Sequence, residues 1–580
     1  MLKSRRVWIW CGAAAVAALV AWTGWIAWQV NRDLNDVVRH SEAIQDAVEV
    51  RDATQLEQAL ANLREASDSA AERTSGITWG ALTLLPIVGD DATGIKVVSR
   101  IADELARDGI EPLVAASESF EDLLPRDGRI DIEAIRSIEE PTSKAQRAFA
   151  DADLLLADID ASGFIARIED RFEDLRKRVR RAATNLRTAS TATRVLPSML
   201  GGDRPQHYLL VFQNNAEIRA TGGLAGAVSY VKSDAGSLQL KAQKAGSEFG
   251  ETSEPVIPLS KAESTLYGDV LGTYFVNAGM TPDVPRAAAL LRARWDQEYP
   301  ARPVDGVIMV DAVAIAYMLE ATGPIDVEGV RIDGDNAVDE LLHRSYLRMP
   351  DPKDQDAFFA EVAEATFDRF IGGVDKPELL IKALARAARE RRSMIHSFDA
   401  QTQSELAGSV IAGEVSKRGA YRDPNVLVTL NDTTGAKMSY FLRYDVDITP
   451  TSCVREVQTY SAKARLRSVA PQEAATLPNY VTGGGDYGIK PGNQVVTLRV
   501  YAPVGGELGA LKVNGAKVDW ETAVEGNRVV GTAYVQLSPA QLVNLTWTMA
   551  SDKGQTGATS VTVTPTIETK DLSYTVASTC

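Results

Sequence analysis

The sequence has few of the residues on which metal and nucleophilic sites depend. Its 580 residues include three cysteines and four histidines. The histidines are scattered and none lies in a nucleophile motif, so no Ser-His-Asp triad can be assembled. No cysteine–histidine spacing suggests zinc. A Walker loop, a dinucleotide-binding fingerprint and an HExxH motif are also missing from the sequence.

Positive charge is also in deficit. The chain has 62 Lys and Arg against 78 Asp and Glu, which gives a formal net charge of −16. Nucleic acid is therefore not expected as a partner, because binding its phosphates needs a basic surface. A composition of 45% hydrophobic and 24% charged residues is that of an ordinary folded protein. The length predicts two to four domains.

One long uncharged run occurs near the N-terminus, over residues 7–30, and Lys3, Arg5 and Arg6 precede it. As a helix rising about 1.5 Å per residue it would cross a hydrocarbon core of about 30 Å. The basic flank predicts a cytoplasmic N-terminus and an extracytoplasmic remainder. We therefore expect a single-pass anchor in the cell membrane. A cleaved signal peptide is the alternative, because small residues within 17–21 keep cleavage open.

The positions of the three cysteines are relevant to the cellular compartment of the protein. Cys11 lies in the uncharged run and reads as a small apolar residue there. Cys453 and Cys580 both lie in the last, strand-rich part of the chain. If that part is extracytoplasmic, a disulfide between them is expected. Two free thiols are the alternative.

The periodicity of apolar residues divides the chain. Helix-like spacing dominates up to about residue 200, strand-like and helical runs then alternate, and short strands separated by turn residues follow. The predicted fold class is a multidomain α+β protein with an N-terminal transmembrane helix. Its predicted parts are a cytoplasmic tail (1–6), the anchor (7–30), a helical stalk (31–200), a central α/β domain (201–425) and a C-terminal antiparallel β-sandwich (426–580).

Within the α/β region the pattern predicts individual elements. Strands are expected at 208–212, 224–231, 237–243 and 304–310, and helices at 285–299, 312–322, 335–346, 356–372 and 377–398.

The first of these strands is followed by the most informative segment. The apolar run Tyr208–Phe212 stops in a polar cluster that leads into a glycine pair. Strands of α/β domains that end in such loops often carry ligand sites, since glycine lets a backbone approach an anion and arginine grips phosphate. A tight β-turn is the alternative. The candidate ligand-binding residues here are Asn214, Asn215, Arg219, Thr221, Gly222 and Gly223.

Two further segments of the same region carry candidate residues. Asn277 and Arg286 flank the start of the helix expected at 285 and suit an anion, although the same pattern is a routine helix start. Asp305 and Asp311 stand at the two ends of a buried strand. Both are candidate metal ligands, and capping of the following helix is the alternative for Asp311.

At these motifs the chain resembles a known family. The segments are QNNAEIRATGG (213–223), TPDVPRAA (281–288), VDGVIMVDAVAIAYMLEATGPIDV (304–327) and DNAVDELL (335–342). They resemble the bacterial membrane-anchored proteins grouped as domain of unknown function 4012. The resemblance implies an anchor, a helical stalk, a central domain and a β-rich tail. It implies no reaction, because the family has none assigned.

The central domain is also distantly similar to the LytR-CpsA-Psr phosphotransferases, which move lipid-linked glycopolymers onto peptidoglycan. In that resemblance Arg219 takes the place of a pyrophosphate-binding arginine and Asn277 that of an asparagine in the following loop. Mg²⁺ is the cofactor that it implies. The sequence departs from those enzymes at Ala220 and Thr221, where they carry a magnesium-binding Asp. Their next Arg-Asp motif has no counterpart near 241–247.

The sequence therefore leaves two functions open. The first is a membrane-anchored extracytoplasmic envelope protein that binds a phosphate-bearing or lipid-linked glycopolymer and, by resemblance, transfers it as a phosphotransferase. Its partners would be the membrane and a cell-wall component. The second is a non-enzymatic cell-surface scaffold or protein-interaction module. An open Arg219 beside a cavity would favour the first, and an Arg219 paired with Glu217 would favour the second.

Overall fold

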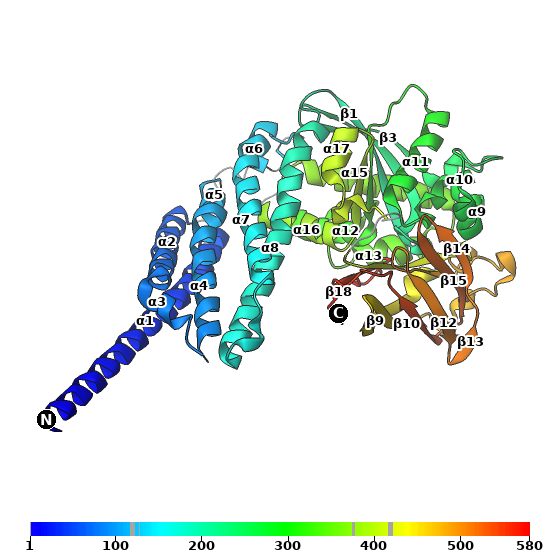
Figure 1. The fold of residues 1–580 in the computed structure, drawn as a ribbon. Helices are drawn as coiled ribbons and strands as arrows, with labels where there is room; N and C mark the ends of the chain where they lie inside the picture. The colour runs from blue at the N-terminus through cyan, green and yellow to red at the C-terminus, as the bar shows by residue number, and fades with distance from the viewer. Residues whose placement is uncertain are drawn as a thin grey trace. The chain divides into compact units, whose positions relative to one another are not determined.

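The computed structural model describes residues 2–50, 52–86, 88–116, 122–123, 125–126, 128–373, 377–415 and 422–580, with side chains at 2–20, 49 and 377–378 left aside. The chain forms a multidomain α+β protein with two compact units. The first unit contains Met1–Leu123 and Asp131–Pro197, and the second contains Leu124–Ile130 and Ser198–Cys580. Figure 1 shows the helices of the first and the sheets of the second.

The first unit is helical. Its apolar residues form buried clusters, which include one around Leu63 and Ala106 and one around Ile101 and Leu156. Asp52 caps the second helix by accepting a hydrogen bond from the Gln55 amide. The helices are α1 (Leu2–Val50), α2 (Ala53–Ser75), α3 (Ile77–Leu82), α4 (Gly89–Glu104), α5 (Glu111–Ala115), α6 (Ile132–Ser137), α7 (Glu139–Ala157) and α8 (Ala166–Met199).

The predicted transmembrane helix over residues 7–30 requires correction. Among the helices of the part of the chain that the structure describes, none is both long enough and apolar enough to cross a membrane. Residues 7–20 lie in α1, but their side chains are outside the described set. Beyond them α1 continues past the charged Arg32 and Asp33, and Val30 packs against Trp79 within the helical unit.

The α/β part of the second unit is built on one mixed sheet of order β3-β2-β1-β4-β7. β1 and β2 form a long antiparallel hairpin, whereas β1 and β4 run parallel. The predicted strands are thus present, with different ends. The bounds are β1 (Gln206–Arg219), β2 (Gly222–Asp234), β3 (Ser237–Ala245), β4 (Gly306–Asp311) and β7 (Ser393–Ser397), with a separate pair β5 (Ile325–Val327) and β6 (Val330–Ile332).

Helices pack on both faces of this sheet. The predicted helix at 377–398 is wrong in its second half, because α16 ends at Arg389 and β7 pairs with β4. The α-helices are α9 (Lys261–Tyr267), α10 (Val270–Thr273), α11 (Val284–Glu298), α12 (Ala312–Thr322), α13 (Ala337–Asp339), α14 (Ser345–Arg348), α15 (Pro352–Ile371), α16 (Pro377–Arg389) and α17 (Ala400–Leu406). The region also contains the 3₁₀ helices η4 (Gly246–Phe249) and η5 (Phe275–Met280) and the π-helix η6 (Glu340–Arg344).

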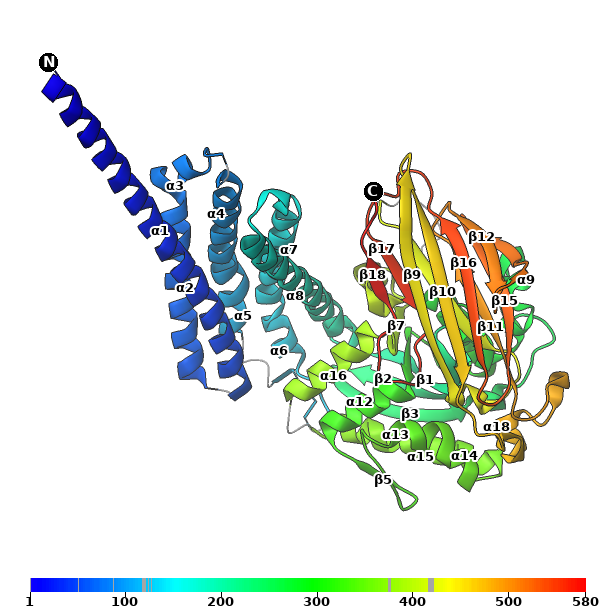
Figure 2. The same ribbon diagram turned by 90° about the horizontal axis from the view of Figure 1, so that it is seen from below.

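The rest of the second unit is a β-sandwich. Its sheets have the orders β13-β12-β16-β10-β9 and β14-β15-β11-β8-β17-β18, and alternating apolar side chains fill the space between them. Figure 2 shows β9, β10, β16 and β12 side by side in the first sheet. The predicted antiparallel pattern fails at one place, where β17 and β8 run parallel.

The sandwich strands are β8 (Asn425–Asp432), β9 (Leu442–Val454), β10 (Val457–Ser468), β11 (Gln494–Tyr501), β12 (Glu507–Val513), β13 (Ala516–Val518), β14 (Glu521–Glu525), β15 (Arg528–Leu537), β16 (Leu542–Ala550), β17 (Thr559–Val563) and β18 (Tyr574–Val576). The short elements η8 (Lys437–Phe441) and α18 (Asn479–Thr482) connect them.

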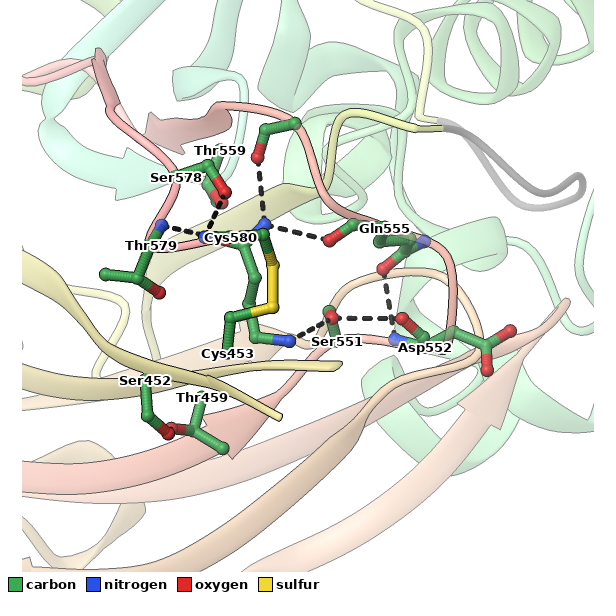
Figure 3. Close-up of a disulfide and its surroundings, with 12 residues drawn as sticks. Ser452, Cys453, Thr459, Ser551, Asp552, Gln555, Thr559, Ser578, Thr579 and Cys580 are labelled. Atoms are coloured by element: carbon green, nitrogen blue, oxygen red, sulfur yellow. Dashed lines mark hydrogen bonds between the residues drawn. A yellow bond between two sulfur atoms is a disulfide. The ribbon is translucent and has the colours of Figure 1, made fainter. Parts of the chain in front are cut away.

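The predicted disulfide is confirmed. Cys453, at the end of β9, is bonded to Cys580, which lies 127 positions away in the sequence. Figure 3 shows the pair among polar residues such as Ser551, Gln555 and Thr579. The Thr579 amide donates to the Gln458 side chain. The same glutamine donates to the Gln555 carbonyl. The C-terminal residues are therefore fastened to the sandwich by a covalent bond and by hydrogen bonds.

Candidate functional site

The segment predicted as a polar loop after Phe212 is a continuation of β1. The strand runs on to Arg219 and turns into β2 through two residues, with an irregularity between Asn214 and Ile218. Gly223 of β2 allows the backbone to pack closely on this irregularity, because a Cβ there would lie 2.4 Å from the carbonyl carbon of Asn214. Gly222 adopts φ 133°, which favours glycine. The glycines thus serve close backbone packing.

The backbone groups at the turn are already used. The Thr221 amide donates to the Gly279 carbonyl at 3.2 Å. The Ala220 amide donates to the Asn431 side chain of β8 at 3.0 Å. The tip of the hairpin is therefore held between η5 and the sandwich. The anion contact predicted for Thr221 stays a prediction, and the amide of Thr221 is already hydrogen-bonded to Gly279.

Arg219 and Asn277, predicted separately, lie together. The Asn277 Oδ1 accepts from the Nη2 of Arg219 at 2.9 Å. The same nitrogen donates to Glu217 Oε1 at 2.7 Å. The Arg219 residue is 5% exposed, so its guanidinium is neutralised inside the protein instead of standing open. A ligand role for Arg219 and Asn277 stays a prediction, and this geometry gives it no support.

Glu217 is the centre of a buried ionic cluster. Its second oxygen accepts from Lys437 of η8, so one carboxylate lies between two cations. Burial by itself would raise the pKa of Glu217, but Lys437 and Arg219 outweigh burial and lower it to about 2. The cluster joins β1 to the sandwich. Lys437 was missed from the sequence, because only the fold brings it 220 positions back to Glu217.

Asp432, at the end of β8, completes this cluster. Its carboxylate accepts from the Thr434 hydroxyl at 2.6 Å and from the Thr434 amide at 2.9 Å. Burial, together with the negative charge of Glu217, raises the pKa of Asp432 to about 6. The two carboxyl groups therefore have opposite pKa shifts, because Glu217 has the cations and Asp432 has the neighbouring anion.

The other predicted anion and metal residues are also paired. Arg286 donates to Glu263 at 2.6 Å on the adjoining segment. Asp305 accepts from Arg204 at 2.9 Å and from the His207 amide at 2.8 Å.

Asp311 caps α12, accepting from the Ala314 amide at 2.8 Å. Its other oxygen accepts from Asn215 and Arg392. Burial raises the pKa of Asp311, even though Arg392 lies beside it. The capping interpretation of Asp311 therefore fits the structure. Within the described part of the chain, no group of three or more His, Cys, Asp or Glu side chains could hold a metal ion.

A pocket lies beside the same hairpin, and Lys437 of the ionic cluster is among its lining residues. It has a volume of about 100 Å³ and extends between β1–β2 and the helices α12 and α15. Most of its lining is apolar, and its polar groups include Gln213, Asn214, Asp356 and Lys437. Of the residues predicted from sequence, Asn214 lines this pocket and Arg219 does not. The apolar lining includes Phe212, Leu224, Val276, Ile315, Leu342, Phe359 and Val362.

The polar residues that line the pocket differ in their interaction partners. Asn214 donates to the Tyr346 hydroxyl and accepts from the Ala216 amide at 3.0 Å. The Lys437 ammonium pairs with Glu217 and lies 5.1 Å from the centre of the Tyr480 ring. Burial raises the pKa of Asp356. Tyr346 and Asp356 were missed as lining residues. Both lie in or beside predicted helices, whose contact with the sheet only the fold establishes.

The comparison with known families identifies the central part of the chain. Residues 203–346 match a family described as protein of unknown function (DUF4012). The match contains all four motifs on which the resemblance was based, and it supports that resemblance for this region. It covers the β1–β2 hairpin and the chain up to α14. The comparisons with curated proteins and with solved structures gave no match. The similarity to LytR-CpsA-Psr enzymes stays a prediction.

Proposed function

We propose that this protein is an extracytoplasmic cell-envelope protein that binds an apolar or lipid-linked envelope molecule through the pocket beside β1. The pocket carries the proposal. Concave sites lined mainly by apolar side chains with a few polar groups are where proteins bind small molecules. The disulfide between Cys453 and Cys580 supports an oxidising compartment.

The size of the pocket limits what enters it. Its volume is about 100 Å³. An engineered apolar cavity of about 150 Å³ binds benzene. The pocket therefore accommodates one end or a short segment of a hydrocarbon chain, and the remainder of a larger ligand would lie outside.

The geometry supports binding more than group transfer. In a phosphotransferase of the LytR-CpsA-Psr type, Arg219 would bind a pyrophosphate. In this fold its guanidinium instead donates hydrogen bonds to Glu217 and Asn277. The candidate carboxylates Asp305 and Asp311 serve an ion pair and a helix cap. The oxygens of these two residues, which would have to hold the Mg²⁺ that the resemblance implies, are already hydrogen-bonded within the protein and do not fit that ion.

The pocket can be closed without strain at Gly226, on β2. A Cβ at this position would meet its nearest atom, the Asn214 Cβ, at 3.5 Å, which is ordinary contact. We would measure binding of decyl glucoside, an alkyl-linked sugar, to the full chain by NMR. Gly226→Leu should weaken binding about tenfold, since it fills the space that the alkyl chain needs.

The matched control is Gln239→Leu, an exposed position on β3 outside the pocket, which should bind as the wild type does. Equal binding by Gly226→Leu and wild type would overturn the proposal.

A non-enzymatic scaffold is the second candidate, and one observation favours it. The ionic cluster of Glu217, Arg219 and Lys437 fastens the hairpin to the sandwich, which is a structural use of residues otherwise suited to a ligand. If decyl glucoside does not bind the wild type, this candidate becomes the better one.

A further inference from the structure

One carboxyl group lines the pocket without a cation to balance it. Asp356, near the start of α15, is a lining residue and is only partly exposed. Within the part of the chain that the structure describes, its carboxylate makes no ion pair, and it accepts one hydrogen bond, from the Ser247 hydroxyl at 3.4 Å. Carboxylates that are removed from water usually have a counter-ion. The proposed function does not yet account for this group.

The surroundings of the carboxyl group place it at the pocket. Asp356, Phe359 and Ala363 follow one another at intervals of three and four residues, so they lie on one face of α15, and all three line the pocket. Ser247, which donates to the carboxylate, is also a lining residue, and so is Lys437, whose charge acts on it. A ligand in the pocket can therefore reach the carboxylate.

The charges around Asp356 favour a cation and oppose an anion. Lys437 does not neutralise it, because the Lys437 ammonium is buried and pairs with Glu217. Burial and the negative charge of the exposed Glu248 raise the pKa of Asp356, and the opposing effects of Ser247 and Lys437 do not cancel that rise. An ammonium group beside the carboxylate would stabilise its charged form, whereas a phosphate or carboxylate would add repulsion.

We propose that the pocket selects a hydrocarbon chain that ends in an ammonium group, with the ammonium donating to the Asp356 carboxylate and the chain lying among the apolar side chains. This inference rests on the proposed function, and it names the chemical class of the ligand as an aliphatic amine.

The test compares three probes that share one octyl chain and differ at its end, namely octylammonium, octan-1-ol and octanoate. Each is titrated at pH 7 into the full wild-type chain and followed by NMR. Octylammonium should bind about fivefold more tightly than octan-1-ol, and octanoate about fivefold more weakly. Equal binding of the three probes, or tightest binding of octanoate, would overturn the inference and leave the pocket as a binding site. This series needs no variant and so does not depend on folding.

A variant then assigns the preference to one carboxylate. Asp356→Asn keeps the size of the side chain, can still accept from Ser247 and removes the charge, so octylammonium and octan-1-ol should bind it with similar affinity.

The matched control is Asp354→Asn, at an exposed position of α15 outside the pocket lining. It removes the same charge and should keep the wild-type preference. A preference that falls equally in both variants would reflect general attraction of a cation to a protein of net charge −16, and it would overturn the inference. Binding of every probe unaffected by Gly226→Leu would instead remove the proposed function itself.

Discussion

Two parts of one hairpin, only a few residues apart, are used in opposite ways. Gln213 and Asn214 line a pocket, whereas Glu217 and Arg219 are enclosed with Lys437 against the sandwich. All four belong to the same polar run of the sequence and to the same strand. The difference lies in what packs on each part. Helices α12 and α15 line the pocket beside the first pair, whereas η8 and β8 supply groups that bond Glu217 and Arg219.

The comparison teaches that a polar motif does not by itself mark a ligand site. Buried charges require partners. Where the fold supplies those partners internally, an arginine has no donor left for an anion.

The largest expected effect comes from removing the shared carboxylate of the enclosed part. Glu217→Gln leaves Arg219 and Lys437 buried without their counter-charge, and it should lower the free energy of unfolding at pH 7 by about 3–5 kcal/mol. Urea denaturation measures this. Arg465→Ala is the control, because the Arg465 side chain is 59% exposed in its pair with Asp445. The control should change stability by less than about 0.5 kcal/mol. A similar loss in both variants would contradict the distinction.

The Glu217 carboxylate also predicts how the stability of the protein depends on pH in the acid range. Since the pKa of Glu217 is lowered to about 2 in the fold, its stabilising contribution is present above the unfolded pKa of about 4.3. That contribution is lost as the pH falls toward 2. The loss should be missing from Glu217→Gln.

An intermediate effect on stability is expected from adding a methyl group at Gly223 or at Gly226, because the two positions differ in the space around the backbone. Gly223→Ala places a Cβ against the Asn214 backbone, and it should destabilise the protein by about 1–3 kcal/mol. Gly226→Ala adds the same methyl group on the pocket side, where the nearest contact is 3.5 Å. It should be neutral within about 0.5 kcal/mol. Thermal melting of the two variants checks this, and equal melting temperatures would mean that the turn is not packed as described.

A further expected effect is limited to one range of pH and concerns Asp432. Its pKa is raised to about 6 in the fold, above an unfolded value of about 3.9. The folded state therefore binds the proton more tightly, so this group stabilises below about pH 4 and its contribution is lost as the pH rises through 6.

Asp432→Asn should flatten the dependence of melting temperature on pH between 4 and 7. The control is Asp519→Asn at an exposed position, which should keep the wild-type slope. An unchanged slope in Asp432→Asn would show that this carboxyl group does not titrate in that range.

Much of the fold could be predicted from local pattern. The strands β1 to β4, the helices around 285 and 312, and the disulfide follow from alternation, helical spacing and the position of the cysteines. The end of β1 was misplaced, because polar residues after Phe212 indicate a loop and yet pair with β2 in the structure. The second half of the helix expected at 377–398 was misread, because β7 is stabilised by its partner β4.

The candidate site was predictable in part. The sequence identified Arg219, Asn277 and Asn214 as polar groups of interest, and Arg219 and Asn277 do meet. It did not indicate that Lys437 and Asp432 would enclose Arg219, nor that Tyr346 and Asp356 would line the pocket. These partners lie in other elements, and no periodicity relates them to the hairpin.

The sequence by itself determined the strand and helix periods, the covalent link available to Cys453 and Cys580, and the polar chemistry that β1 carries. Those properties are local, or they follow from residue type. The tertiary structure alone decided which polar residues of β1 are paired inside the protein and which line the pocket. That decision depends on neighbours more than 200 positions away, as for Glu217 and Lys437. The free energy of a buried polar group is set by its partners, which only the packed chain assembles.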